Sequence, residues 1–419
     1  MKKIEDVKKE KKSKSAGKVV LAYSGGLDTT TLIPWLKEHF NYEVVCVCIN
    51  CGQEEELDGL EKRAKSCGAS KVYILNLIDE FCDEYILPCL QANAVYEHKY
   101  LLGTSMARPM IAKHLVEVAH KEKAVAICHG ATGKGNDQIR FELGIKALDS
   151  NIKIIAPWRM TDIWDMKSRE DEIKYCEKHG IKLQFSKDSS YSRDRNIWHI
   201  SHEGLELEDP SKGPNYKKML VLSVTPQDAP NKETDITIDF YRGVPTKLNG
   251  KKMKFSKILE ELNTLGGKNG IGIDDIVENR VVGMKSRGVY ETPGGTILLE
   301  AHKQLEELIH DRQTLEFKQY IAIKMAQVVY EGKWFSPLRK ALQSFVEATQ
   351  KRVTGTVKLK LYKGNIIKNG TTSPHSLYNE KLSSFTTGDL YDHNDASGFI
   401  NLFGLPETVR CMVDNNKKK

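Results

Sequence analysis

The first 180 residues alternate between short apolar runs and longer amphipathic stretches. Four runs rich in Val, Ile and Cys predict buried strands, at 18–23, 43–49, 71–75 and 124–128. Apolar residues recur at helical spacing over four other stretches, at 29–39, 57–67, 111–119 and 167–179. Gly68 and Gly180 follow two of these stretches and are typical helix stop signals. This alternation predicts an α/β fold with a parallel sheet, whose ligands bind at the carboxyl ends of the strands.

The pattern changes after about residue 180. Residues 210–230 form an irregular stretch with several prolines, and a long helical pattern covers 298–331. Alternating apolar residues predict strands at 236–240 and 357–361, and the second precedes Lys363-Gly364-Asn365, a hairpin signal. We expect an α+β second domain, followed after Pro374 by a short helix and an irregular tail.

The composition is that of an ordinary soluble globular chain of two or three domains, with 419 residues, 40% of them hydrophobic and 28% charged. No apolar run approaches the ~18 residues of a membrane-spanning helix. The formal net charge of +7 sits at the ends: residues 1–18 carry +5 and the last three lysines +3, which leaves −1 for the rest. We expect a disordered lysine-rich head at 1–17. A nucleic-acid partner is disfavoured by the near-neutral body.

Nine cysteines without a secretory signal predict free thiols and a cytoplasmic protein. Cys46, Cys48 and Cys51 form the one cluster, and no second Cys/His pair with zinc spacing follows it. Buried strand thiols and a metal site are the two interpretations, and the strand-like alternation favours the first.

The sharpest chemical signal is Ser24-Gly25-Gly26-Leu27-Asp28-Thr29-Thr30, which follows the first strand and opens a helix. Glycines let backbone amides approach an anion, and the hydroxyls and the helix N-terminus supply donors. The pattern predicts a phosphate-binding loop. The alternative is a structural turn in which Asp28 or Thr29 caps the helix. Neither the dinucleotide fingerprint nor the Walker pattern matches.

A second glycine-rich stretch, HGATGKGND at 129–137, follows the strand at 124–128 and precedes a helix that contains Arg140. An anion-binding loop and a structural turn are both possible interpretations. Because the carboxyl ends of parallel strands meet at one edge of a sheet, we expect this loop and the first to face one crevice.

The first loop resembles the SGGxD-S/T loop of the ATP pyrophosphatases, which cleave ATP between its α and β phosphates. Five blocks in order resemble the argininosuccinate synthase family: AYSGGLDTT, LLGTSMARP, HGATGKGNDQIRFE, APWRM and VENRVVGMKSRGVYETPGGT. The resemblance implies an AMP-forming C–N ligase of arginine biosynthesis and the urea cycle, which joins citrulline to aspartate with ATP and Mg²⁺. It implies a cytoplasmic homotetramer with an ATP-binding domain at 18–180, a synthetase domain at 181–370 and a C-terminal oligomerisation arm at 371–419.

The resemblance also assigns site residues. Its ATP-binding positions fall on Ala22, Tyr23, Ser24, Gly25, Gly26, Leu27, Asp28, Thr29, Thr30, Ile49 and Gly130. Its citrulline-binding positions fall on Tyr100, Ser105, Asn136, Arg140, Ser192, Ser201, Glu278 and Tyr290. Its aspartate-binding positions fall on Thr132, Asn136 and Asp137. Asp28, Asp137 and Arg140 are the catalytic candidates, and no residue is assigned to a metal.

Several of these residues have a structural alternative. Arg140 suits a carboxylate clamp but also a helix-surface charge. Tyr100 and Tyr290 could be core aromatics with one solvent-exposed edge, and Glu278 could form half of a salt bridge with Arg280 or another neighbour.

The implied chemistry has two steps, formation of a citrullyl-adenylate and displacement of AMP by the amine of aspartate. It needs positioning and charge stabilisation more than a strong acid–base pair. Whether Asp137 takes a proton or only orients the amine stays open. The alternatives are an amidating or tRNA-thiolating relative among the ATP pyrophosphatases, a nucleotide-dependent regulatory protein, and an RNA binder that uses its lysine-rich ends.

Overall fold

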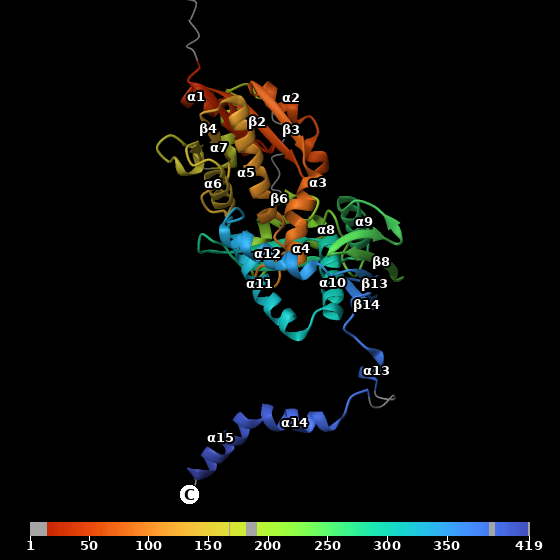
Figure 1. Ribbon diagram of the computed structural model, residues 1–419. Coiled ribbons are helices and arrows are strands. Elements are labelled where there is room, and N and C mark those ends of the chain that lie inside the picture. Colours follow the sequence, from red (N-terminus) through yellow and green to blue (C-terminus); the bar gives the residue numbers. More distant parts are fainter. Residues whose placement is uncertain (1–14, 167, 182–190, 385–389, 418–419) are drawn as a thin grey trace, which may run out of the picture.

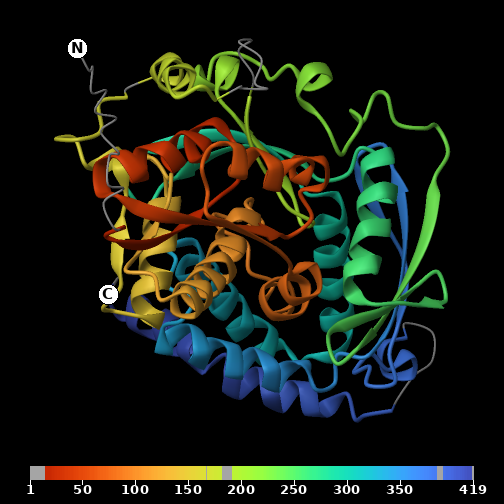
Figure 2. The same ribbon diagram turned by 90° about the horizontal axis from the view of Figure 1, so that it is seen from above.

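The computed structural model describes residues 15–166, 168–181, 191–384 and 390–417. A parallel sheet with its helices forms one end of the molecule, and antiparallel sheets with long helices form the middle (Figure 1). Seen from above, the parallel sheet and the sheet that contains β8 and β13 lie on opposite sides of the molecule (Figure 2). The lysine-rich head lies outside the described residues up to position 14, as do Lys167, Lys418 and Lys419.

The first sheet is parallel throughout and has the strand order β3-β2-β1-β4-β5. Its strands are β1 (Gly17–Ala22), β2 (Tyr42–Asn50), β3 (Lys71–Asn76), β4 (Ala126–Cys128) and β5 (Lys153–Ile155). The four strands expected from the apolar runs are confirmed, although β4 begins two residues later than predicted. The three-residue β5 was missed because so short a run carries no periodic signal.

Successive side chains of these strands point to opposite faces of the sheet, so each face has its own core. Val19, Leu21 and Cys46 pack on the side of α1, whereas Val20 and Val45 belong to the core on the side of α5. The helices of this region are α1 (Leu27–Phe40), α2 (Leu60–Ser66), α5 (Gly103–Glu122), α6 (Asp137–Leu148) and α7 (Arg169–Lys178). Short helical turns lie at Glu54–Leu57 and Pro157–Arg159.

One helical segment leaves the parallel sheet and joins the other half of the molecule. It comprises α3 (Ile78–Glu80), a π-helical turn (Phe81–Ile86) and α4 (Leu87–Ala92). Helix α4 contacts α10, α11 and α12 of the second half. Those helices, with α8 and α9, have the bounds α8 (Tyr216–Met219), α9 (Phe255–Lys268), α10 (Pro293–Ile309), α11 (Arg312–Tyr330) and α12 (Pro337–Gln350).

The helical pattern within 298–331 is confirmed, and two helices, α10 and α11, share this stretch. Asp311 ends the pattern: its side chain accepts a hydrogen bond from the Thr314 amide at 2.9 Å and thereby starts α11 as an N-cap.

A five-stranded antiparallel sheet has the order β10-β9-β8-β13-β14. Its strands are β8 (Thr234–Tyr241), β9 (Val244–Leu248), β10 (Lys251–Lys252), β13 (Gly355–Tyr362) and β14 (Asn365–Thr372). Both alternating patterns of the sequence are confirmed as strands. The predicted hairpin is also confirmed, with φ of 46° at Lys363 and 80° at Gly364, the two positive values that a type I′ turn needs.

A third sheet was not predicted. It is antiparallel, with the order β11-β12-β7-β6, and its strands are β6 (Ser192–Arg195), β7 (Ile200–Glu203), β11 (Ile273–Asn279) and β12 (Lys285–Glu291). A further short helical turn lies at Leu205–Glu208. Strands β6 and β7 have only four residues each, and the sheet carries many charged and hydroxyl residues, which hide the alternation that marks a half-buried strand.

The chain ends in a segment that leaves the body (Figure 1). It contains α13 (Glu380–Ser383), α14 (Asn394–Phe403) and α15 (Leu405–Asn416), so the expectation of an irregular tail is wrong. The i, i+4 spacing of Phe399 and Phe403 was available in the sequence as a helical signal. Among the described helices, none is both long and apolar enough to cross a membrane.

Candidate active site

A wide cleft lies where the strand order of the parallel sheet reverses. The chain runs from β1 outward to β2 and β3 on one side and returns to β4 and β5 on the other, so β1 and β4 are neighbours. Ligands of open α/β sheets bind at such a switch point. Both glycine-rich loops line this cleft, which has a volume of about 620 Å³, and the third sheet forms its opposite wall.

The first loop makes a sharp turn at Gly25, directly before helix α1 begins at the cleft. Gly25 has a φ of +81°, which favours glycine, and a Cβ added there would lie 3.1 Å from Leu60 and Arg63. Arg63 Nη1 donates to the Gly25 carbonyl oxygen at 2.7 Å. Helix α1 begins at Leu27, with Gly26 as its N-cap. The alternative in which Asp28 or Thr29 caps the helix is therefore wrong, and a residue without a side chain precedes the first-turn amides.

The hydroxyl groups of this loop divide into two pairs. Ser24 Oγ lies 3.1 Å from Thr29 Oγ1, and both residues line the cleft. Tyr23 OH lies 3.3 Å from the Oγ1 of Thr30, which is fully buried. Thr30 therefore supports the loop from the core side.

Asp28 faces a second carboxyl group, that of Glu172 on α7, which is only 1% exposed. Burial, and then the hydrogen bond and charge of Asp28, raise the pKa of Glu172 to about 9. Glu172 thus carries a proton at neutral pH and donates it to Asp28. Its Oε1 has no hydrogen-bond partner among the described residues.

The second loop touches the first. A Cβ added at Gly130 would lie 3.3 Å from Cγ2 of Thr29. Gln138 Nε2 folds the loop back on itself by donating to the carbonyl oxygens of Gly133 at 2.7 Å and Gly135 at 3.1 Å. Thr132, Asn136 and Asp137 then face the cleft at the start of α6.

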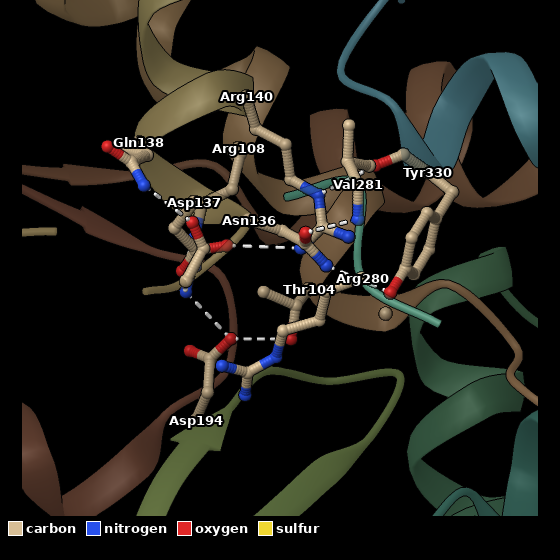
Figure 3. Close-up of polar contacts among 12 residues, drawn as sticks. Thr104, Arg108, Asn136, Asp137, Gln138, Arg140, Asp194, Arg280, Val281 and Tyr330 are labelled. Atoms are coloured by element: carbon tan, nitrogen blue, oxygen red, sulfur yellow. Dashed lines mark hydrogen bonds and ion pairs between the residues drawn. The ribbon is translucent and has the colours of Figure 1, made fainter. Parts of the chain in front are cut away.

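Asp137 lies between two guanidinium groups (Figure 3). Arg108 donates to its Oδ2 from Nε at 2.9 Å and from Nη2 at 2.7 Å, and Arg140 Nη1 donates to its Oδ1 at 3.1 Å. Burial alone would raise the pKa of Asp137, but the two arginines outweigh it and hold that pKa below its ordinary value. Asp137 is therefore a firmly ionised carboxylate and a weak base.

The sequence analysis did not predict Arg108 as a site residue, nor the residues that hold it in place. Its Nη2 also donates to Asp194 Oδ2 at 2.8 Å, and Thr104 Oγ1 donates to the same oxygen at 2.7 Å. His199 Nε2 lies 3.2 Å from Thr104 Oγ1, and burial lowers the pKa of His199 to about 4. Because Thr104 gives its proton to Asp194, the neutral His199 donates to Thr104. Thr104 and Arg108 stand on α5, Asp194 stands on β6, and His199 directly precedes β7, so no local motif links them.

Arg140 is buried, so its interpretation as a surface charge is wrong. Its Nε donates to the Tyr330 carbonyl oxygen at 3.0 Å, and its Nη2 has no partner among the described residues. An unpaired buried guanidinium nitrogen at a cleft suits a carboxylate ligand.

The third sheet brings Ser192, Ser201, Glu278 and Tyr290 to the cleft. Asp194 and Tyr290 both pair with Ser201 across neighbouring strands, so these three side chains share one face. Glu278 accepts hydrogen bonds from the hydroxyls of Tyr290 and Tyr330. The expected alternative, a Glu278–Arg280 salt bridge, is wrong: Arg280 Nη2 pairs with Glu203 Oε2 at 2.7 Å.

Tyr100 and Tyr290 are both buried and both line the cleft, so they serve the core and the cleft together. Their rings lie 4.9 Å apart.

Three of the predicted site residues do not line the cleft, namely Gly25, Thr30 and Ser105. Ser105 is fully buried on α5.

The cysteine cluster is buried, with Cys46 and Cys48 on β2, and Cys48 and Cys51 line the cleft. Burial raises the pKa of Cys51 to about 12, so this thiol stays protonated. Within the described ranges, no group of three or more His, Cys, Asp and Glu side chains is placed to hold a metal ion.

Comparison with known proteins matches two family models to the chain. Residues 18–182 match the arginosuccinate synthase N-terminal HUP domain, and residues 191–410 match the arginosuccinate synthase C-terminal domain. An argininosuccinate synthase of Agathobacter rectalis is 73% identical over 395 residues, which cover 94% of this chain and 97% of the relative. One of Lachnospira eligens is 71% identical over 403 residues, covering 96% and 98%. One of Brachyspira hyodysenteriae is 58% identical over 402 residues, also covering 96% and 98%.

Proposed function

The chain belongs to the argininosuccinate synthase family and is an ATP-dependent ligase, and we propose that its cleft is where citrulline and aspartate are joined. The observation that carries this placement is the meeting of two glycine-rich loops with Arg140 and Glu278 around one cleft. One side offers amides and hydroxyls for phosphates, and the other offers groups that match an amino acid.

ATP lies along the first loop. The loop from Ala22 to Thr30 holds the β and γ phosphates, with Thr30 supporting it from the core side, while Ile49 and Gly130 border the rest of the nucleotide. The start of α1, where the N-cap Gly26 makes no side-chain hydrogen bond, and the neighbouring Ser24 and Thr29 hydroxyls support this placement. Mg²⁺ enters with ATP, bound to its phosphate oxygens, as part of the substrate.

Citrulline lies between the second loop and the third sheet. Its carboxylate accepts a hydrogen bond from the unpaired Nη2 of Arg140, and its α-amino group donates to the Glu278 carboxylate. Asn136, Ser192, Ser201, Tyr100 and Tyr290 complete the surroundings, with Ser105 behind them.

Aspartate binds at Thr132, Asn136 and Asp137. A carboxylate held by Arg108 and Arg140 attracts the ammonium group of aspartate but is a poor proton acceptor. Asp137 therefore orients the amine, and the amine loses its proton to another acceptor.

The reaction proceeds in two displacements. The ureido oxygen of citrulline bonds to the α-phosphorus of ATP while the bond to the β-phosphate oxygen breaks, and pyrophosphate leaves. The aspartate nitrogen then bonds to the ureido carbon, the carbon–oxygen bond breaks, and AMP leaves with the electron pair. Both steps gain from fixed positions and from donors aimed at developing negative charge.

The test measures AMP and pyrophosphate with citrulline and aspartate supplied singly and together. Full turnover requires both amino acids and yields AMP and pyrophosphate in equal amounts. ADP as the nucleotide product, or turnover without citrulline, would refute the proposal.

We further propose that the protein is a cytoplasmic homotetramer assembled through its C-terminal arm. The cysteines support the compartment: none of those in the described part of the chain forms a disulfide. Phe399, Ile400, Leu402 and Phe403 of α14 are each 63–73% exposed, which supports docking onto a second copy of the chain.

A further inference from the structure

Tyr330 is the last residue of α11 and lies directly behind the cleft. Its side chain is 1% exposed, and it does not line the cleft itself. It nevertheless contacts three of the residues placed around citrulline. Two of them, Asn136 and Arg140, are labelled beside it in Figure 3, and the third is Glu278.

The directions of its hydrogen bonds are fixed by the single hydroxyl proton. Tyr330 donates this proton to Glu278 Oε2 and accepts a hydrogen bond from Asn136 Nδ2 at 2.9 Å. The Asn136 side chain also has a partner at its other end, because its Oδ1 accepts a hydrogen bond from the Val281 backbone amide at 2.9 Å. The two hydrogen bonds together fix the orientation of the Asn136 side-chain amide. Burial, and then the charge of Glu278, raise the pKa of Tyr330 well above its ordinary value, so the proton stays on the hydroxyl.

The backbone and ring of Tyr330 hold Arg140. The Tyr330 carbonyl oxygen accepts from Arg140 Nε at 3.0 Å, and the guanidinium carbon lies 4.8 Å from the ring centre. The ring also stacks on Tyr96 at 3.6 Å. One side chain thus joins α11 to residues of the second loop, α6 and β11.

We propose that Tyr330 is a positioning residue for citrulline, which fixes the Glu278 carboxylate and the Asn136 amide through its hydroxyl and the Arg140 guanidinium through its ring and carbonyl. This inference rests on the proposed citrulline site. The hydroxyl can be tested alone, because Tyr330→Phe keeps the ring on Tyr96 and Arg140 and leaves the backbone bond in place.

The chain offers a matched control in Tyr96→Phe. The two rings are stacked, but the Tyr96 hydroxyl donates to the Asn279 carbonyl oxygen at 2.8 Å and contacts none of the three citrulline residues. We expect Tyr330→Phe to raise KM for citrulline about tenfold or more, the effect of one lost hydrogen bond to a charged group. KM for ATP changes less than twofold, and Tyr96→Phe leaves both values within twofold of the wild type.

A double variant separates positioning from general loss of packing. If Tyr330 acts through Glu278, adding Tyr330→Phe to Glu278→Gln raises KM for citrulline by clearly less than it does in the wild type. Equilibrium binding of citrulline below the melting temperature gives the same comparison if Tyr330→Phe lowers stability. Unchanged citrulline affinity, or equal losses for citrulline and ATP, would overturn the inference while leaving the proposed function intact. A wild-type protein that releases no AMP with citrulline and aspartate would overturn both.

Discussion

At the scale of single residues, the partly exposed Asp137 and the buried Glu172 have opposite protonation states because their neighbours differ. Asp137 lies between Arg108 and Arg140 and stays ionised. Glu172 faces Asp28 without a comparable positive charge close by and keeps its proton. The same residue types, read in the sequence alone, give no sign of this difference, because the partners come from separate elements.

The protonated Glu172 makes the stability of the protein depend on pH. Its pKa is about 9 in the fold against 4.5 in the unfolded chain. The groups that act on it are Asp28 on α1 and Arg169 and Asp171 on α7. A raised pKa stabilises the fold fully below the unfolded value, and that stability is lost as the pH rises toward the folded value.

Glu172→Gln keeps a donor for Asp28 and cannot ionise. We expect it to stabilise the protein by about 1–3 kcal/mol at pH 8 and by much less at pH 5. Thermal unfolding of both proteins between pH 5 and pH 9 measures the difference. A difference that does not change with pH would show that Glu172 is ionised in the fold.

Arg140→Lys tests the guanidinium at the citrulline end of the cleft. Lysine keeps the positive charge but cannot donate to Asp137, the Tyr330 carbonyl and a ligand carboxylate at once. We expect KM for citrulline to rise about 10- to 100-fold, which corresponds to about 1.5–3 kcal/mol, with unchanged far-UV circular dichroism. Steady-state kinetics at saturating ATP and aspartate provide the measurement. A KM within twofold of the wild type would remove Arg140 from the site.

At the scale of elements, Glu122 at the end of α5 ties this helix to two strands of the parallel sheet. Its carboxylate accepts from Lys18 Nζ on β1 at 2.8 Å, and from Lys71 Nζ at 2.6 Å and Tyr73 OH at 2.5 Å on β3. The Lys18 hydrogen bond first, and then those from Lys71 and Tyr73, lower the pKa of Glu122 to about 2.

A lowered pKa gives stability that is present above the unfolded value of 4.5 and is lost as the pH falls toward 2. Glu122→Gln should therefore cost about 1 kcal/mol at pH 7, since both lysines are partly exposed, and almost nothing at pH 2.5. Urea unfolding at the two pH values measures this. Glu61→Gln, which breaks an exposed pair with Lys65, is the control and should have little effect at either pH.

The elements that could be predicted are those whose side chains separate apolar from polar positions. The sequence shows the buried apolar positions of strands β1, β2, β8 and β13. It also shows the first loop, because Gly25 and Gly26 separate a strand from the helix that follows it. Strand β6 was missed because all four of its residues are polar and line the cleft. Strand β11 was missed because Asp274, Asp275, Glu278 and Asn279 interrupt its apolar positions, and of these Glu278 lines the cleft. The requirements of the site thus erase the pattern on which strand prediction depends.

The candidate site follows the same rule. Both glycine-rich loops could be located from local pattern, and the strand order places them together. Arg108, Asp194 and Tyr330 could not be found in this way. Arg108 looks like any helical arginine, and only the tertiary fold brings it to Asp137 and Asp194.

At the scale of the whole molecule, the C-terminal arm lacks the burial that normally holds short helices together. Helices α14 and α15 have 10 and 12 residues and no buried residue. Isolated helices of this length are marginal in water, because packing of an apolar face supplies most of their stability. A surface to cover this face must come from elsewhere, and a second copy of the chain is the partner that we propose.

The stacked pair Phe399 and Phe403 gives the sharpest test of this assembly. Their rings lie 5.1 Å apart, and burying an exposed Phe side chain contributes about 1.5–3 kcal/mol. Phe399→Asp with Phe403→Asp should therefore shift the full-length protein to smaller species in size-exclusion chromatography with light scattering. Asn401→Asp adds charge to an exposed polar position of the same helix and should leave the mass unchanged. A monomeric wild type at micromolar concentration, or an unchanged mass for the double variant, would contradict assembly through the arm.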